Sequence, residues 1–139
     1  MSLLELMVVL AIISLISALA YPSYMQFVVK AKRGAAKSIL LQVADRQQQF
    51  FMDNKRYAAT LTQLGFPANP FVIADDGAFV AAGDAASVYS VTLSNLSTTT
   101  YTVTAAPQQN QAAKDTMCGS LTMTHTGAKG RSGGAANCW

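Results

Sequence analysis

The stretch that decides the fold is SLLELMVVLAIISLISALAYPSYMQFVVKAKR, residues 2–33. From Leu6 to Val29 it holds twenty-four residues without an ionisable side chain. As an α-helix these residues would span roughly 36 Å, enough to cross a bilayer core of about 30 Å. The stretch therefore predicts a membrane-spanning anchor over residues 1–29. The presence of Glu5 at the edge of this span has to be explained, because placing a carboxylate inside a bilayer costs about 2.5–3.5 kcal/mol.

Two other interpretations of this segment are weaker. Ala18-Leu19-Ala20 matches the cleavage pattern of a secretory signal, but Glu5 stands where such a signal carries basic residues. A core helix of a soluble protein is disfavoured by the length of the segment and by its near-total lack of polar side chains. The anchor remains the preferred interpretation.

The two cysteines, Cys118 and Cys138, bracket a loop rich in Gly, Ser and Thr, with nineteen residues between them. They are best interpreted as one disulfide, which requires an oxidising compartment; the alternative is two reduced thiols. The single histidine, His125, lacks the CxxC or HxxxH partners of a metal site. No metal site, cofactor or catalytic set is predicted, and ADDGAF at 74–79 is interpreted as a turn rather than a calcium loop.

Charge is distributed unevenly along the chain. The formal net charge is +3, yet residues 30–56 hold seven basic and two acidic side chains, and residues 57–139 hold three basic and four acidic ones. A basic run directly after the apolar span suits anionic lipid headgroups or acidic neighbours. By the positive-inside rule it would also hold the domain in the cytoplasm, where disulfides are rare. A basic leader removed from the front of the chain would resolve this conflict.

The helical pattern continues beyond the span. Apolar side chains recur at three- and four-residue steps as far as Phe51, and Gln47 interrupts their stripe. Asp53 and Asn54 favour a stop, so a second helical half is expected over residues 30–53. A helix of this total length would be roughly 80 Å long, too long for a chain of this size to enclose. Lipid or other copies of the protein must cover its first half.

Four positions weaken this long helix. Pro22 removes one backbone hydrogen bond, so either a passive kink or a segment that can unwind is expected there. Ser14, Ser17 and Gly34 are further weak points.

The remainder predicts a connecting loop and then strands. Residues 54–86 are rich in Gly, Pro, Ala and Asp without a sustained period. Within residues 87–139, alternating apolar residues in SVYSVTL, TYTVTA and GSLTMTH predict an antiparallel sheet of about four strands, followed by a disulfide-closed loop. The expected fold class is α+β, with the long N-terminal helix packed through its C-terminal half on this sheet. Residues 30–139 would form the globular head.

Residues 2–33 resemble the N-terminal segment of type IV pilins, the subunits of bacterial type IV pilus filaments. The likeness includes Glu5, Pro22 and the basic run after the span. It continues more faintly in RQQQFFMDNKRYAATLTQLGF at 46–66. The end of the chain, CGSLTMTHTGAKG…NCW at 118–139, resembles the disulfide-closed end of a type IVa-like branch. That branch contains filament-forming pilins and minor pilins that bind DNA during uptake.

The resemblance implies that a leader is cleaved just before Met1 and that the new terminal amine is methylated. The family usually has Phe where this chain has Met1. It also implies that Glu5 pairs with the terminal amine of Met1 in a neighbouring subunit, which pins the register of a filament. Residues 1–29 would form the polymer core, in which Pro22 and Ser14 permit local unwinding.

The expected function is a structural subunit of a type IV pilus, not an enzyme, with adhesion, twitching motility or DNA uptake as roles of the pilus. Its partners would be other copies in a helical filament and the pilus assembly machinery. It would lie in the bacterial inner membrane before assembly and in the extracellular pilus afterwards. Two alternatives stay open: a minor pilin that contacts DNA through Lys129 and Arg131, and a pseudopilin of type II secretion. No cofactor is expected.

Overall fold

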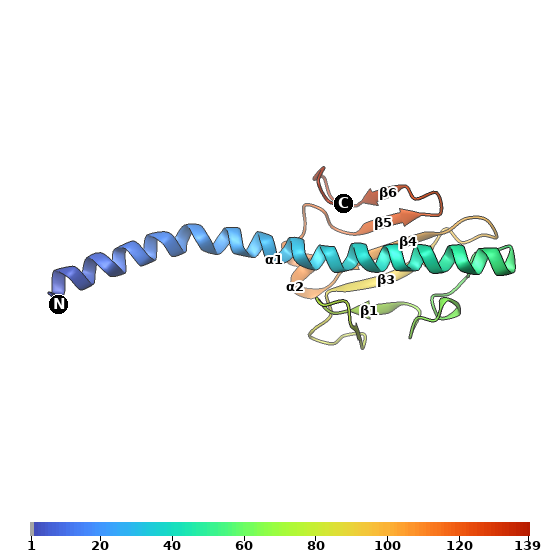
Figure 1. Ribbon diagram of the computed structural model, residues 1–139, viewed down its shortest axis with the longest axis horizontal. Helices are drawn as coiled ribbons and strands as arrows, with labels where there is room; N and C mark the ends of the chain where they lie inside the picture. Colours follow the sequence, from blue (N-terminus) through green and yellow to red (C-terminus); the bar gives the residue numbers. More distant parts are fainter. Residues whose placement is uncertain (1) are drawn as a thin grey trace.

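The computed structural model describes residues 2–139, so Met1 and the site predicted at its amine lie outside the described residues. A single helix of 52 residues, α1 (Leu3–Asn54), dominates the molecule. Figure 1 shows its first half projecting away from a compact head and its second half lying across a sheet. The predicted long N-terminal helix, packed through its C-terminal half, is confirmed.

Local interactions define both ends of α1. The side chain of Ser2 accepts a hydrogen bond from the backbone N–H of Glu5 at 3.3 Å, as expected of a serine at the N-cap. At the other end Lys55 adopts the left-handed conformation, and its N–H donates to the carbonyl of Phe51. The helix continues through Pro22 without a break.

A six-stranded antiparallel sheet, in the order β2-β1-β3-β4-β5-β6, forms the layer beneath the second half of α1. Its central strands β3, β4 and β5 form a meander in which each strand pairs with the next, and α1 packs against β4 and β5. In chain order the strands are β1 (Phe71–Ile73), β2 (Phe79–Val80), β3 (Tyr89–Ser94), β4 (Thr102–Pro107), β5 (Leu121–Thr124) and β6 (Lys129–Arg131).

The core lies between α1 and one face of the sheet. In β3, β4 and β5 buried residues alternate with half-buried Ser, Thr and Ala, as the period of two predicts. Tyr89 and Tyr101 are among the largest fully buried side chains. The helix contributes the apolar side chains that are buried beneath it: Ala36, Ile39, Leu40 and Val43.

The sheet has six strands where the sequence predicts about four. β1 and β2 lie in the segment 54–86 that is predicted to be a loop, and β6 lies in the predicted closing loop. All three residues of β1 are buried, so β1 shows no alternation, and β6 has the sequence KGR without an apolar residue. These short strands pair only at the edges of the sheet.

The polar segment PQQNQAAKD has no periodic pattern in the sequence, yet it contains a short helix, α2 (Gln109–Lys114). A 3₁₀ turn, η1 (Thr62–Leu64), lies in the segment after α1. The predicted disulfide is confirmed: Cys118 and Cys138 are bonded, and both are buried. It holds the C-terminal segment against the start of β5.

Candidate functional site

The first half of α1 exposes an apolar surface. Its most apolar window of eighteen residues has a mean hydropathy of 2.6, and none of that window is buried within the molecule. Such a helix is long and apolar enough to cross a membrane. Exposed large apolar side chains occur along the whole stretch, among them Leu3, Leu4, Met7, Leu10, Ile13, Leu15, Ile16, Leu19, Tyr21, Tyr24 and Phe27.

Three predicted site residues of this half lie within the described residues, and all three are on exposed helix: Glu5, Ser14 and Pro22. Glu5 is in the first turn, where a negative charge is favourable beside the positive end of the helix dipole. The hydroxyl of Ser14 donates to the carbonyl of Ala11 at 2.8 Å, which holds it within the helix. At Pro22 the helix lacks one N–H donor but remains regular. These residues belong to the half of α1 that projects away from the head (Figure 1).

A buried polar cluster lies where α1 leaves the head. Arg33 forms an ion pair with Asp115, with its Nε 3.0 Å from Oδ2 and its Nη2 donating to Oδ1. Tyr89 donates its hydroxyl proton to the same carboxylate at 3.1 Å. The hydrogen bond to Asp115 raises the pKa of Arg33, against the opposing effect of burial. Burial is also the main reason that the pKa of Tyr89 rises to about 12.

Gln111 of α2 completes this cluster and contacts the backbone of α1. Its Nε2 lies 3.1 Å from the carbonyl oxygen of Val29 and 3.1 Å from the hydroxyl of Tyr89. The contact falls at the last residue of the uncharged span. We call Arg33, Tyr89, Gln111 and Asp115 the exit cluster, because they tie α1 to the head where the exposed half begins.

A basic patch lies on the opposite side of α1 from β1. It consists of Lys30 and Lys37 on α1 with Lys129 and Arg131 on β6. Partial burial lowers the pKa of Lys37, and the positive charges of Arg33, Lys30 and Lys129 lower it further. The sequence singled out Lys129 and Arg131, and the structure adds the two helical lysines.

Trp139 is part of the wall of this patch. Its indole Nε1 donates to the carbonyl of Gly130 in β6 at 2.8 Å. The ammonium of Lys129 lies 5.2 Å from the centre of a Trp139 ring, within range of a cation–π interaction. The disulfide at Cys138 fixes the residue beside Trp139, so the closing loop holds the basic edge of the sheet in place.

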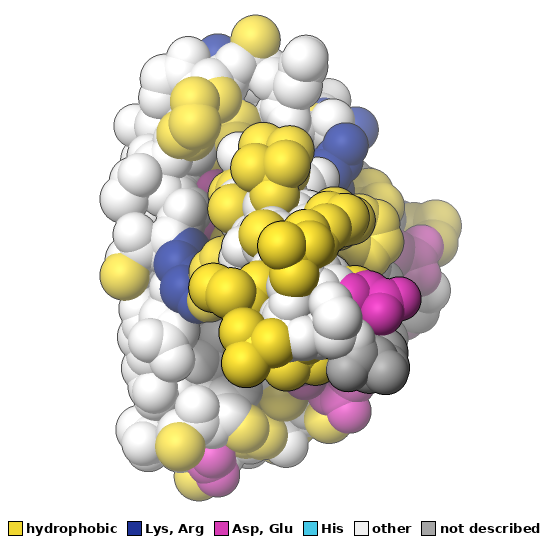
Figure 2. Space-filling view, turned by 90° about the vertical axis from the view of Figure 1, so that its left-hand side faces the viewer, with side chains coloured by type: hydrophobic (Ala, Val, Ile, Leu, Met, Phe, Trp, Pro, Cys, Tyr) yellow, Lys and Arg dark blue, Asp and Glu magenta, His cyan; other side chains and the backbone are white. Residues whose placement is uncertain are grey.

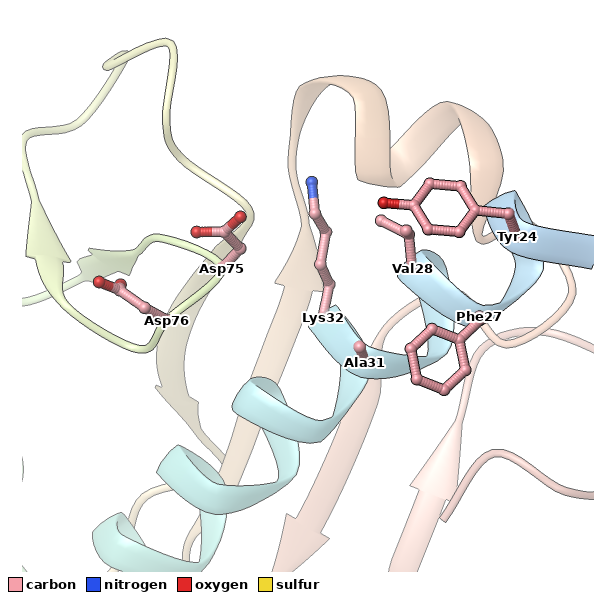
Figure 3. Close-up of a pocket in the computed structure, with 7 residues that line it drawn as sticks. All are labelled: Tyr24, Phe27, Val28, Ala31, Lys32, Asp75 and Asp76. Atoms are coloured by element: carbon pink, nitrogen blue, oxygen red, sulfur yellow. The ribbon is translucent and has the colours of Figure 1, made fainter. Parts of the chain in front are cut away.

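A groove opens on the other side of α1, between the helix and the turn from β1 to β2. Its volume is about 360 Å³. Figure 3 shows Tyr24, Phe27 and Val28 on the helix side and the carboxylates of Asp75 and Asp76 on the turn side. Lys32 stands between the two sides. We call this the acidic groove. Figure 2, which looks along α1 from its N-terminal end, shows basic side chains at the top and at mid-height, and acidic ones in the lower part and also at the right-hand edge.

His125 and the turn at 74–79 are the remaining features that the sequence singles out. His125 follows β5 and lies beside Tyr57 and Tyr101, with ring centres 6.4 Å from each. Within residues 2–139 no three His, Cys, Asp or Glu side chains are grouped as a metal site requires. The turn at 74–79 is closed by Asp76, which accepts a hydrogen bond from the backbone N–H of Ala78.

Comparison with known proteins identifies the family. A family model described as "Type IV minor pilin ComP, DNA uptake sequence receptor" matches residues 22–122, which is more than half of the chain. The chain belongs to this family of type IV pilins. The match includes the exit cluster and the helical lysines of the basic patch, but it ends before Lys129 and Arg131.

Two further similar proteins are type IV pilins. The pilin is 35% identical over 65 residues to "Type IV major pilin protein PilA" of Myxococcus xanthus (strain DK1622). That match covers 47% of the pilin but only 30% of the M. xanthus protein. A solved type IV pilin structure from Shewanella oneidensis superimposes with a TM-score of 0.51 at 20% identity, over 80% of this chain and 97% of that one. At this identity the second likeness concerns the fold alone.

Proposed function

We propose that this pilin is a subunit of a type IV pilus filament that assembles through the first half of α1 after leaving the inner membrane. The observation that carries the proposal is the apolar surface of α1, none of whose most apolar window is buried within the molecule. Exposed to water, this surface is unfavourable by about 25 cal/mol per Å². Lipid covers it before assembly, and the same half of α1 in other copies covers it in a filament.

The role proposed for this pilin is structural, not enzymatic. Its partners are other copies of the chain and the pilus assembly machinery, and its final location is the extracellular pilus. A pseudopilin role is less favoured, since the family model that matches describes a type IV pilin.

Glu5 is the residue that sets the register between copies in this proposal. It lies in the first turn of α1, within an otherwise apolar surface. Inside a filament core its carboxylate would pair with the terminal amine of Met1 in a neighbouring copy. An unpaired charge buried there is strongly unfavourable, by about 3–5 kcal/mol when one partner of a buried pair is removed. Copies that are axially misplaced would bury the carboxylate alone.

The test replaces Glu5 with Gln and compares it with Glu5→Asp, which keeps the charge. Glu5→Gln makes the span more apolar, so the amount of membrane-bound pilin should not fall, while pilus yield should fall strongly. Glu5→Asp should retain part of the yield. Normal numbers of pili in Glu5→Gln cells would refute the pairing. Loss of the pilin from the membrane would instead place the role of Glu5 before assembly.

Ser14 and Pro22 are proposed to mark the segment of α1 that unwinds during packing into a filament. Pro22 already lacks one backbone hydrogen bond, so this region is the easiest part of the exposed helix to open. Pro22→Ala restores the missing donor and stiffens the helix. In assembled pili, faster amide exchange near residues 14–22 than in membrane-bound pilin would support the unwinding, and equal exchange in both states would argue against it.

Capture of DNA is a second candidate function, and two observations favour it. The matching family is described as a DNA uptake sequence receptor, and the basic patch offers four side chains for phosphate contacts. Phosphate contacts supply most of the sequence-independent affinity for DNA. Here Lys129 and Arg131 on β6 would act with Lys30 and Lys37 on α1, in a patch that two elements far apart in the sequence build together.

The test measures binding of double-stranded DNA to the full-length pilin in a neutral detergent as salt is raised. Lys129→Ala with Arg131→Ala should weaken binding and lower the salt slope by about 0.9 for each lost phosphate contact. Lys55→Ala with Arg56→Ala is the matched control, since it removes the same charge at the far end of α1. Equal effects of the two double variants would show that net charge, not the basic patch, attracts DNA.

A further inference from the structure

The charges of the head are segregated between the two edges of the sheet. Residues 57–113 contain three acidic side chains and no basic one, and residues 116–139 contain two basic side chains and no acidic one. The strand order places β1 and β2 at one edge and β6 at the other. Asp75 and Asp76 therefore lie at the first edge, and Lys129 and Arg131 at the opposite one. All four side chains are exposed.

The acidic edge is shaped to receive a long basic side chain. The acidic groove offers Tyr24 and Phe27, both exposed on α1, as an apolar wall, and the carboxylates of Asp75 and Asp76 stand across from them (Figure 3). The stem of a lysine or arginine packs well on such a wall while its charged end reaches a carboxylate. Lys32 of the same chain lies in the groove, but it forms no ion pair within 4.0 Å there among the described residues.

We propose that the acidic groove of one pilin binds the β6 edge of a second copy, with Asp75 and Asp76 facing Lys129 and Arg131 of the neighbour. This inference rests on the proposed filament, and it assigns a contact between heads in addition to the packing of α1. The charges are opposite, and the two surfaces lie on opposite sides of α1. The contact is heterologous, because each copy offers one surface to the neighbour on either side. Heterologous contacts that do not close produce helical filaments.

The geometry also requires an axial displacement between the two copies. The sheet register gives the two levels. Asp75 follows Ile73, which pairs with Tyr89 of β3. Lys129 is level with Leu93 of β3, through the paired residues Met123 and Val103. Tyr89 and Leu93 are four residues apart, or about 13 Å along the strand. Copies at the same depth in a membrane hold the two surfaces at different heights. The contact therefore forms only when neighbours are staggered, as they are in a helical assembly and not in a flat bilayer.

The contact guides packing rather than driving it. Exposed ion pairs are individually weak and are screened by salt, so they cannot hold copies together without the apolar burial of α1. These ion pairs select which edge of the neighbouring head is bound and at which axial displacement. If two identical edges approached each other, like charges would meet and repel. The β6 edge is also part of the basic patch, so a head that docks there leaves fewer groups for DNA.

A water-soluble carbodiimide tests the contact directly, because it joins a carboxylate to an amine only when the two groups touch. Pili sheared from cells are treated, and cross-linked peptides are identified by mass spectrometry. We expect a link between Asp75 or Asp76 and Lys129. Since these residues lie at opposite edges of one head, the link must join two copies. It should be absent in membrane-bound pilin and should decrease at high salt.

Matched variants complete the experiment. Asp75→Asn with Asp76→Asn removes both carboxylates that could react and keeps an acceptor for the N–H of Ala78. It should therefore abolish this cross-link, which confirms how the link is assigned. Asp45→Asn with Asp53→Asn removes the same charge elsewhere on the head and should leave it unchanged. The double variant Asp75→Lys with Lys129→Asp exchanges the two charges. It should again give a link between positions 75 and 129, now with the amine at 75 and the carboxylate at 129.

The outcomes separate this inference from the proposed function. Pilin that is present in pili without the link between Asp75 or Asp76 and Lys129 would overturn the contact and leave the filament role standing. Pilin that is absent from every pilus preparation would overturn both. An equal yield of the cross-link in membranes and in pili would refute the claim that the contact requires an axial displacement between neighbours.

Discussion

Arg33 and Asp115 are 82 positions apart in the chain, yet their side chains form an ion pair at the point where α1 leaves the head. The carboxylate of Asp115 is 1% exposed, and it also accepts the hydroxyl proton of Tyr89. Buried ion pairs stabilise a fold little in net terms, but they become costly when one partner is removed. The pair therefore fixes where α1 crosses the head more than it adds to stability.

Replacing Arg33 with Met should destabilise the head by about 3–5 kcal/mol, because Asp115 is then buried without its counter-ion. The double variant Arg33→Met with Asp115→Leu should lose much less, since it buries no charge. Urea unfolding of full-length pilin in detergent, followed by the fluorescence of Trp139, gives the free energies. Lys30→Met, on the exposed side of the same helix, is the control and should change stability by less than about 0.5 kcal/mol. Additive losses in the double variant would contradict the pairing.

Gln47 should contribute to the stability of the head although it interrupts an apolar stripe. Its amide accepts from the N–H of Ala58 at 2.8 Å and donates to the carbonyl of Ala58 at 3.1 Å, and its side chain is fully buried. Gln47→Leu should cost about 1–3 kcal/mol, because both backbone groups lose their partner. Gln42→Leu makes the same change on the exposed face and should be nearly neutral. Faster amide exchange at Ala58 would locate the effect, and unchanged exchange would count against it.

Removal of the disulfide should loosen the closing loop and weaken the whole head. In the chain-entropy model a loop of this size contributes about 3 kcal/mol. The double variant Cys118→Ser with Cys138→Ser should therefore melt at a lower temperature than the oxidised pilin. Reductant should lower the melting temperature of the natural chain to the same level and have no effect on the variant. Equal melting of oxidised and reduced pilin would show that packing alone holds the loop.

Stability should fall in strongly alkaline solution. Burial raises the pKa of both Tyr89 and Tyr101 to about 12, from about 10 in an unfolded chain. The folded state favours the neutral phenols, so their contribution is complete below about pH 10 and is lost as the pH rises towards 12. Tyr101→Phe should flatten this loss with little effect at neutral pH. Unfolding measured between pH 8 and 12 checks the sign, and stability that rises with pH would refute it.

The sequence predicts those elements whose residues repeat with a clear period. The apolar span and the amphipathic stripe after it predict α1, and alternation predicts β3, β4 and β5. Strand β1 is missed because all three of its residues are buried, and edge strand β6 because none of its residues is apolar. Their pairing depends on the neighbouring strand and not on a local pattern.

The exit cluster could not be predicted for a related reason. Arg33 belongs to a basic run that resembles a solvated surface, and Asp115 is the last residue of a polar segment with no periodic signal. Only the fold brings them together. Gln47 did give a signal, since a lone amide within an apolar stripe is unusual, but its partner at Ala58 lies in an irregular segment. The roles proposed for Glu5, Ser14 and Pro22 concern contacts between copies, which a single chain does not contain.

The hydrogen bond from Gln111 to the carbonyl of Val29 also decides where a mechanical load enters the head. Tension along α1 reaches the head first at Val29 and then at Arg33, one turn later. From there it passes to β3 through Tyr89 and to the end of α2 through Asp115, the C-cap residue of that helix. The strands run roughly along α1 (Figure 1), so the load acts on them in shear, and many ladder hydrogen bonds resist it together. A pulling force on one end of this molecule is thus distributed over several paired strands of its sheet.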